Sequence, residues 1–319
     1  MNRAQGSKIG DRTCPRPQLI LAGLVALAFA ISQATPLHAQ ALGWEGETGV
    51  FVTPLAYTAS AEGQKFHPVV AYHYFNAGPV VGQFHEVSTE VGLGKRFEAG
   101  YTHEFHVEGG NAALSPQWQN GFEIFSAKFI LVAENWKHHP AVPAVSVGFI
   151  GRTGVRNVGN YLTWNPAKSN GKNNADIYLV ATKTITQTKI PLVLNVGVRG
   201  TNAELWGMGG NAPDWEARPF VAVAFVFPGP RHSTLIFGSE AATQPHHPAG
   251  FTSFSDIGGL PLNIPTTLSY CMRIVPSPRH NLNIDFGVAQ IAGQIYGSGP
   301  TGVNLQARHQ LGTQITYGF

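Results

Sequence analysis

The sequence predicts an all-β fold, an antiparallel up-and-down transmembrane β-barrel of about twelve strands. Gly and Pro supply 37 and 22 of the 319 residues, which disfavours long helices. Charged residues make up only 12%, yet no apolar run reaches the roughly 20 residues that a spanning helix needs. Segments of strand length are separated by connections that alternate between short and long. Together these observations exclude a disordered chain, a coiled coil and a helical membrane protein with several spans.

The first 41 residues have the pattern of a secretory signal peptide. Four basic residues come before an apolar stretch from Leu19 to Ile31, and the segment ends in Ala39-Gln40-Ala41. A basic region, a short apolar core and small residues at the end are typical of an export signal that is cleaved off. We therefore expect cleavage after Ala41. A retained anchor or a buried helix is the alternative.

Removal of this segment changes the charge of the chain. The segment holds four of the 21 basic residues and one of the 18 acidic residues, so 17 of each kind remain. The neutral balance argues against a nucleic-acid partner. Cys271 is then the only cysteine, because Cys14 lies in the leader. A fold without a disulfide has to close by hydrogen bonding and packing.

Twelve segments are expected to form the strands of the barrel. They are 67–76, 84–93, 97–107, 122–134, 141–151, 177–187, 191–200, 219–227, 232–240, 266–275, 281–291 and 307–319. From residue 84 onward the connections alternate between short and long without exception, which is typical of a barrel with brief periplasmic turns and extended outer loops. The segment 67–76 makes the strand number even, as bacterial single-chain barrels require.

The position of residues 42–65 is left open by the sequence. Pro54 interrupts an otherwise strand-like stretch, which suits an edge strand or a segment outside the sheet. We expect this segment in the lumen or in the periplasm, and residues 66–319 in the barrel. If 49–57 pairs in the wall instead, another strand is needed elsewhere and the barrel has fourteen strands.

The last strand shows the clearest alternation of side chains. Apolar residues at every second position include Leu311 and Ile315, and the strand ends on the aromatic pair Tyr317 and Phe319. This ending resembles the C-terminal assembly signal of bacterial outer-membrane β-barrel proteins. The resemblance implies recognition by the barrel assembly machinery and residence in the lipid bilayer of the outer membrane.

The hairpin 84–107 carries charged residues on its inner face. A three-residue turn at 94–96 keeps the apolar residues of both strands on one face. This register makes Glu86 and Glu104 direct neighbours across the strands, where like charges destabilise by about 0.2 to 1 kcal/mol. The predicted lumen charge cluster consists of Glu86, Glu90, Glu98, Glu104 and His106.

Four carboxylates on one wall need compensation by other groups. Ion pairs with partners such as Lys128 or Arg199 are the favoured interpretation. A constriction that attracts cations is the second, and a metal or acid–base site is the third.

The histidines do not form a recognisable metal site. His103 and His106 are three residues apart on a strand and so face opposite sides, while His138 and His139 fall in a connection. The motifs H-E-x-x-H, C-x-x-C and G-x-S-x-G do not occur in the sequence. We expect no metal, no cofactor and no enzymatic activity.

The long loops are rich in Asn, Gly and aromatic residues. The aromatic loop residues singled out are Trp164, Trp206 and Trp215. Planar rings beside amide side chains can bind sugars, but Trp near strand ends also anchors a barrel at the membrane interface. The second role is the favoured one.

A polar inner face within a closed barrel favours a passive channel for ions or small polar solutes. Lumen charges would bias which solutes enter, with no covalent step. One alternative is a structural or receptor barrel whose lumen is plugged by its loops or by residues 42–65. Another is an outer-membrane barrel hydrolase, and a soluble two-sheet sandwich is a third.

Overall fold

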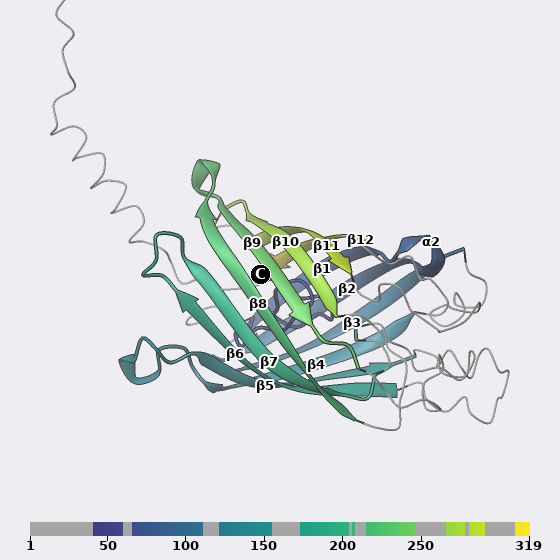
Figure 1. The fold of residues 1–319 in the computed structure, drawn as a ribbon, viewed down its shortest axis with the longest axis horizontal. Coiled ribbons are helices and arrows are strands. Elements are labelled where there is room, and N and C mark those ends of the chain that lie inside the picture. The colour runs from purple at the N-terminus through teal and green to yellow at the C-terminus, as the bar shows by residue number, and fades with distance from the viewer. Residues whose placement is uncertain are drawn as a thin grey trace, which may run out of the picture. The chain divides into compact units, whose positions relative to one another are not determined.

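The protein forms a single closed antiparallel barrel of twelve strands (Figure 1). The computed structural model describes residues 41–59, 66–110, 121–154, 173–203, 206–207, 215–245, 266–277, 281–290 and 310–319. Sequential strands pair with one another, and the first strand closes the ring by pairing with the last. The predictions of an up-and-down barrel and of twelve strands are confirmed, and the alternative of fourteen strands is not found in the described residues.

The strands have nine to thirteen residues each. They are β1 (Phe66–Asn76), β2 (Gly82–Leu93), β3 (Phe97–Glu108), β4 (Phe122–Val132), β5 (Ala144–Thr153), β6 (Asn173–Ile185), β7 (Leu192–Thr201), β8 (Glu216–Pro228), β9 (Thr234–Ala242), β10 (Thr267–Val275), β11 (Leu282–Gln290) and β12 (Gln310–Gly318). The helical segments are α2 (Gly78–Val81), η2 (Trp136–His138) and η4 (Pro230–His232). Within the described residues, no helix has the length and apolar character to cross a membrane.

All twelve predicted strands are present, but some boundaries differ. Strand β6 begins earlier than predicted, at Asn173, because Asn174 belongs to the wall and accepts a hydrogen bond from Arg152 at 2.7 Å. Strand β5 begins later, at Ala144, just after Pro143. A proline has no N–H to donate to the ladder, so the strand starts beyond it.

The hairpin of β2 and β3 has the predicted register. Leu93 pairs with Phe97, and Glu86 pairs with Glu104. Gly94, with a φ of 62°, begins the three-residue turn between the two strands. A left-handed backbone of this kind is easy for glycine and strained for most other residues.

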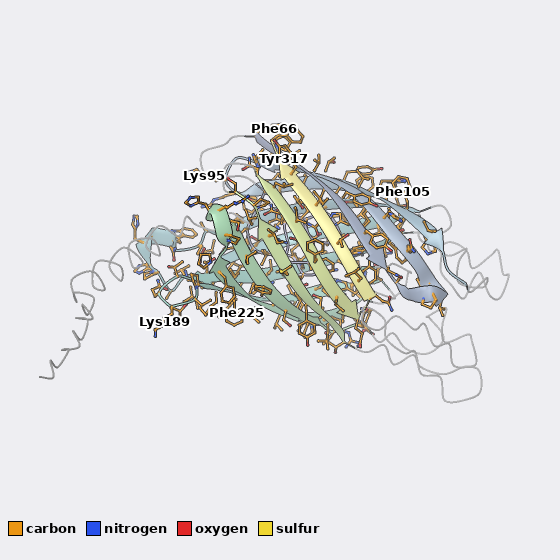
Figure 2. All side chains as sticks on the ribbon, turned by 90° about the horizontal axis from the view of Figure 1, so that it is seen from above. Phe66, Lys95, Phe105, Lys189, Phe225 and Tyr317 are labelled. Carbon is orange, nitrogen blue, oxygen red and sulfur yellow. The ribbon has the colours of Figure 1, made fainter. Side chains whose placement is uncertain are left out.

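Apolar side chains cover the outside of the barrel. Phe105, Phe225 and Tyr317 stand out from the wall (Figure 2) and are 50%, 42% and 43% exposed. Every second residue along the strands contributes to this surface, and the neighbours in between are buried. An apolar belt of this extent is the surface that lipid hydrocarbon covers in a transmembrane barrel.

The inside of the barrel is filled by an N-terminal segment, residues 42–59, which we call the plug. It appears in purple within the ring of strands (Figure 1). Trp44 and Phe51 are buried in one apolar cluster with Phe75 and Phe84 of the wall. Apart from two short backbone bridges, the plug is neither helix nor strand. Some of its backbone N–H groups donate within the plug, as Trp44 does to the Phe51 carbonyl at 2.9 Å, and further polar groups have partners on the wall.

Candidate functional site

Glu240 on β9 holds the middle of the plug through its backbone. Its Oε1 accepts the N–H groups of Phe51, Val52 and Thr53 at 3.2, 3.1 and 2.7 Å. The Thr53 hydroxyl donates to the same oxygen at 2.6 Å, and the Ser269 hydroxyl donates to Oε2. Successive N–H groups aimed at one carboxylate form a concave anion-binding site. The wall supplies the anion, and the plug supplies the donors.

Glu98 on β3 makes a second anchor for the plug. Its carboxylate accepts the Thr48 N–H at 3.1 Å, the Thr48 hydroxyl at 2.7 Å and the Ala59 N–H at 2.7 Å. Lys128 lies 2.6 Å from the same carboxylate and donates to the Thr48 carbonyl at 2.9 Å. Both charges are buried, so loss of either partner would leave a costly unpaired charge.

Two arginines and two carboxylates form the third anchor. Glu45 of the plug accepts from Arg152 Nε at 2.6 Å and from Arg199 Nη1 at 2.7 Å. Asp176 on β6 accepts from the same two arginines at 2.6 and 2.8 Å. The four charges balance within this buried group. Arg199, named from sequence as a partner for the glutamates of 84–107, pairs with Glu45 and Asp176.

Wall side chains also satisfy the carbonyl groups of the plug. The donor and acceptor pairs are Gln314 with Leu42, Arg273 with Val50 (2.6 Å), Asn195 with Pro54 (3.0 Å) and Ser146 with Ala56 (2.6 Å). These contacts come from strands around the whole ring. The plug is thus held along its length by polar groups of the inner face.

A pair of wall glycines makes room for the plug. Gly287 on β11 and Gly312 on β12 are direct partners in the sheet. A Cβ on Gly287 would lie 2.9 Å from the ring of Phe51, and one on Gly312 would also collide with it. The absence of a side chain at both positions lets the outer end of the Phe51 ring approach the wall closely.

The predicted lumen cluster divides into parts with different surroundings. Glu98 anchors the plug, while Glu90 accepts the Ser126 hydroxyl at 2.9 Å. Glu86 and Glu104 face each other, are fully buried and have no hydrogen-bond partner within the described part of the chain. The cluster therefore does not act as one unit.

His106, the fifth member of the predicted cluster, lies beside the helix α2. A ring nitrogen of His106 is 2.7 Å from the Val81 carbonyl oxygen, and its ring centroid is 4.7 Å from that of Phe84. Over the described ranges, no group of three or more His, Cys, Asp or Glu is arranged to hold a metal ion.

Glu47 is a plug carboxylate without a hydrogen-bond partner in the described residues. Burial, together with the nearby Glu45, raises its pKa from 4.5 to about 7 against the opposing charges of Arg199 and Lys128. The neutral form is therefore favoured while the plug is in place. A change of this size corresponds to on the order of 3 kcal/mol between the two protonation states.

We expect the plug to bind less tightly as the pH rises from about 4.5 to about 7. Below the ordinary pKa of 4.5 Glu47 is protonated both in the docked and in the released plug, so its titration does not weaken docking there. Between these values the released plug loses the proton that the docked plug keeps, so release becomes easier as the pH rises, and the effect is complete above about 7. Accessibility of the plug to chymotrypsin, which can cleave at Trp44, Phe51 and Tyr57, or to a spin-label probe, followed against pH, should rise across this range. Glu47→Gln should flatten the profile, and an unchanged profile in that variant would contradict the prediction.

The predicted aromatic residues lie in different environments. Tyr317 and Phe319 both point outward, with ring centroids 5.0 Å apart. Trp215 is 51% exposed at the start of β8, whereas Trp206 is buried and faces the bore. Trp164 lies outside the described residues.

Comparison with known proteins gives similarity of fold only. No protein-family description and no curated protein matches the sequence. A NanC porin structure has a TM-score of 0.42 and 8% identity, over 79% of this chain and 98% of that one. A KdgM porin has a TM-score of 0.42 and 10% identity, over 79% and 98%. An outer membrane channel from Pseudomonas putida F1 has a TM-score of 0.43 and 9% identity, over 82% and 100%. At this level of similarity no activity is transferred to this chain.

Proposed function

We propose that the protein is exported, cleaved after Ala41 and inserted in the outer membrane, where it forms a channel for ions or small polar solutes that the plug closes. The leader pattern of residues 1–41 supports export, and the apolar belt of the barrel supports a place in a bilayer. The outward pair Tyr317 and Phe319 supports recognition by the assembly machinery. Solutes would pass by diffusion once the plug has left the bore.

The chemistry of the contacts between plug and wall carries this proposal. The plug is bound by buried carboxylates, arginines, amides and hydroxyls rather than by an apolar core alone. Water can replace each of these partners when the plug leaves, whereas exposing an apolar interface has no such compensation. Buried ion pairs add little net stability compared with apolar packing. A wall of this kind is suited to a bore that is alternately filled by protein and by water.

A structural or receptor barrel with a permanent plug is the second candidate. The observation that favours it is the apolar part of the interface, in which Trp44 and Phe51 pack among wall aromatics. A permanent plug would leave the barrel without ion flow whatever polar contact is removed. The two candidates therefore differ in the effect of weakening one polar anchor.

Planar-bilayer recording of the Glu98→Gln variant tests the channel proposal. The substitution removes the charge that holds Thr48, Ala59 and Lys128, so the plug should leave more often and discrete current steps should become frequent. Glu104→Gln is the matched control, because it changes another buried carboxylate of β3 that has no hydrogen-bond partner in the described structure.

The expected result is rare current steps in the wild type and in Glu104→Gln, and frequent steps in Glu98→Gln. A silent Glu98→Gln barrel that is folded, as shown by its heat-dependent shift on a gel, would contradict the channel and favour the permanently plugged barrel.

A further inference from the structure

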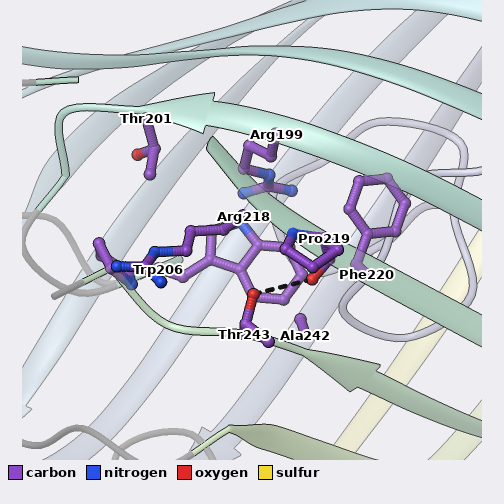
Figure 3. A pocket seen from close by; sticks show the side chains of 9 residues that line it. Arg199, Thr201, Trp206, Arg218, Pro219, Phe220, Ala242 and Thr243 are labelled. Carbon is purple, nitrogen blue, oxygen red and sulfur yellow. Dashed lines mark hydrogen bonds between the residues drawn. The ribbon is translucent and has the colours of Figure 1, made fainter. Parts of the chain in front are cut away.

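A crevice with unused hydrogen-bond donors lies on the inner face between β7, β8 and β9. It sits where these strands meet the long connections, at the opposite end of the barrel from the short turns. Arg199, Trp206 and Arg218 line it together (Figure 3), and the space between them is too narrow to hold a water molecule in this arrangement.

Arg199 presents one free edge of its guanidinium group. Nη1 is used by Glu45 and Asp176, as described above. Nε and Nη2 have no hydrogen-bond partner among the residues that the structure describes, although the side chain is 1% exposed. These two nitrogens carry parallel N–H groups, the arrangement that a carboxylate accepts with both of its oxygens. Donors that are buried and unpaired are costly, and a ligand that accepts hydrogen bonds from them removes that cost.

Trp206 adds a third free donor beside the arginine. The Arg199 guanidinium carbon lies over the Trp206 ring, 4.0 Å from its centroid. The indole Nε1 is buried and lacks a partner in the described part of the chain. The Trp206 backbone N–H donates to the Gln244 side chain at 2.8 Å, which fixes the residue at this position.

The surrounding charges determine what kind of ligand fits. Arg152 and Arg199 are balanced by Glu45 and Asp176, so no excess positive charge draws in anions in general. Recognition must come from the geometry of the free donors. Chloride cannot accept two parallel hydrogen bonds on separate atoms, but a carboxylate can.

Arg218 lines the crevice beside these donors. Its side chain is 26% exposed and pairs with Glu216. Because the crevice is too narrow for a water molecule in this arrangement, a ligand would have to displace the Arg218 side chain in order to enter, and side-chain changes of this kind are common at binding sites.

We propose that Arg199 and Trp206 form a binding site for the carboxylate group of a small organic acid. This inference rests on the proposed function, because it names the class of solute that the channel would bind at the end of the barrel where the long connections lie. The binding itself does not require the plug to leave.

The test is an NMR titration of the full mature protein in detergent micelles with acetate, at constant ionic strength set by chloride. The probe is the indole N–H signal of Trp206, assigned from the Trp206→Phe variant. The Trp136 indole is an internal control, because it lies in the connection after β4 with Arg96 5.8 Å from its ring centroid. A saturable shift of the Trp206 signal alone is expected, with no change in Trp136.

Two variants separate the effect of the specific N–H donors from that of positive charge alone. Arg199→Lys keeps the positive charge but loses the paired donors, and should weaken acetate binding by roughly tenfold or more. Trp206→Phe keeps an aromatic ring, though a smaller one, and removes the indole donor. Followed through the Arg199 Nε–H signal, it should bind acetate several-fold more weakly.

Three results would overturn the site: no acetate shift, an equal shift with chloride, or unchanged binding in Arg199→Lys. An equal affinity for inorganic phosphate would overturn its assignment to carboxylates. Current steps in Glu98→Gln combined with no acetate binding would leave the channel standing and remove the site. Acetate binding combined with a silent Glu98→Gln barrel would rule out the channel and leave a binding site within a closed barrel.

Discussion

Replacing Glu240 with glutamine is expected to raise the fraction of open channels by roughly 100-fold. The carboxylate accepts three successive backbone N–H groups of the plug and the Thr53 hydroxyl. Glutamine keeps one acceptor oxygen, loses the charge and turns an NH₂ group toward these donors. Hydrogen bonds to charged groups contribute about 1.5 to 3 kcal/mol each, so we expect the substitution to weaken plug binding by about 3 kcal/mol. That loss corresponds to roughly a 100-fold change in an equilibrium.

The open fraction can be measured in planar bilayers as the time spent at conducting levels. Glu90→Gln is the matched control, since Glu90 is another buried wall carboxylate and its recorded partner is Ser126 rather than the plug. Both variants should show the same heat-dependent shift on gels as the wild type. Equal open fractions in Glu240→Gln and Glu90→Gln would contradict the role assigned to the carboxylate.

The architecture of the barrel was accessible from sequence because it depends on local patterns. Alternation with a period of two sets which side chains face lipid, and the connection lengths set the strand order. The register of β2 and β3 followed from keeping apolar residues on one face. Boundaries were less accessible, since the polar start of β6 at Asn173 and Asn174 had the composition of a loop.

The contacts of the plug could not be derived in the same way. Glu45 and Arg199 are 154 residues apart, and Phe51 and Glu240 are 189 apart. Pairing over such separations depends on the closed ring and leaves no periodic signal. A weak signal did exist at Glu240, a single acid in an otherwise uncharged strand, which implies an inward position with a partner. Pro54 disfavours a wall strand at 49–57, and the structure has no wall strand there. The proline carries no information, however, about where the segment packs.

A cysteine at position 50 should allow the plug to be locked to the wall. Val50 packs in a cluster beside Cys271 of β10. A Cβ on Gly238 would lie 2.9 Å from the Cys271 sulfur and 3.4 Å from Val50 Cγ1, so the two side chains approach the same point on the wall. A disulfide requires the two Cβ atoms to approach to about 3.5 to 4.5 Å. Cys271 is free, and in the mature chain proposed above, which lacks Cys14, it is the only native thiol left to react.

The lock is most informative when it is added to the Glu240→Gln variant. Oxidised Val50→Cys/Glu240→Gln should be silent in bilayers, because the covalent link holds the plug although its anchor is weakened. Dithiothreitol should restore the frequent current steps of Glu240→Gln in the same membrane. Val50→Ser in the same background controls for loss of the valine and should conduct with or without oxidant. If mass spectrometry shows the complete disulfide and the oxidised protein still conducts like the reduced one, ions pass while the plug remains bound, and plug release is not the gate.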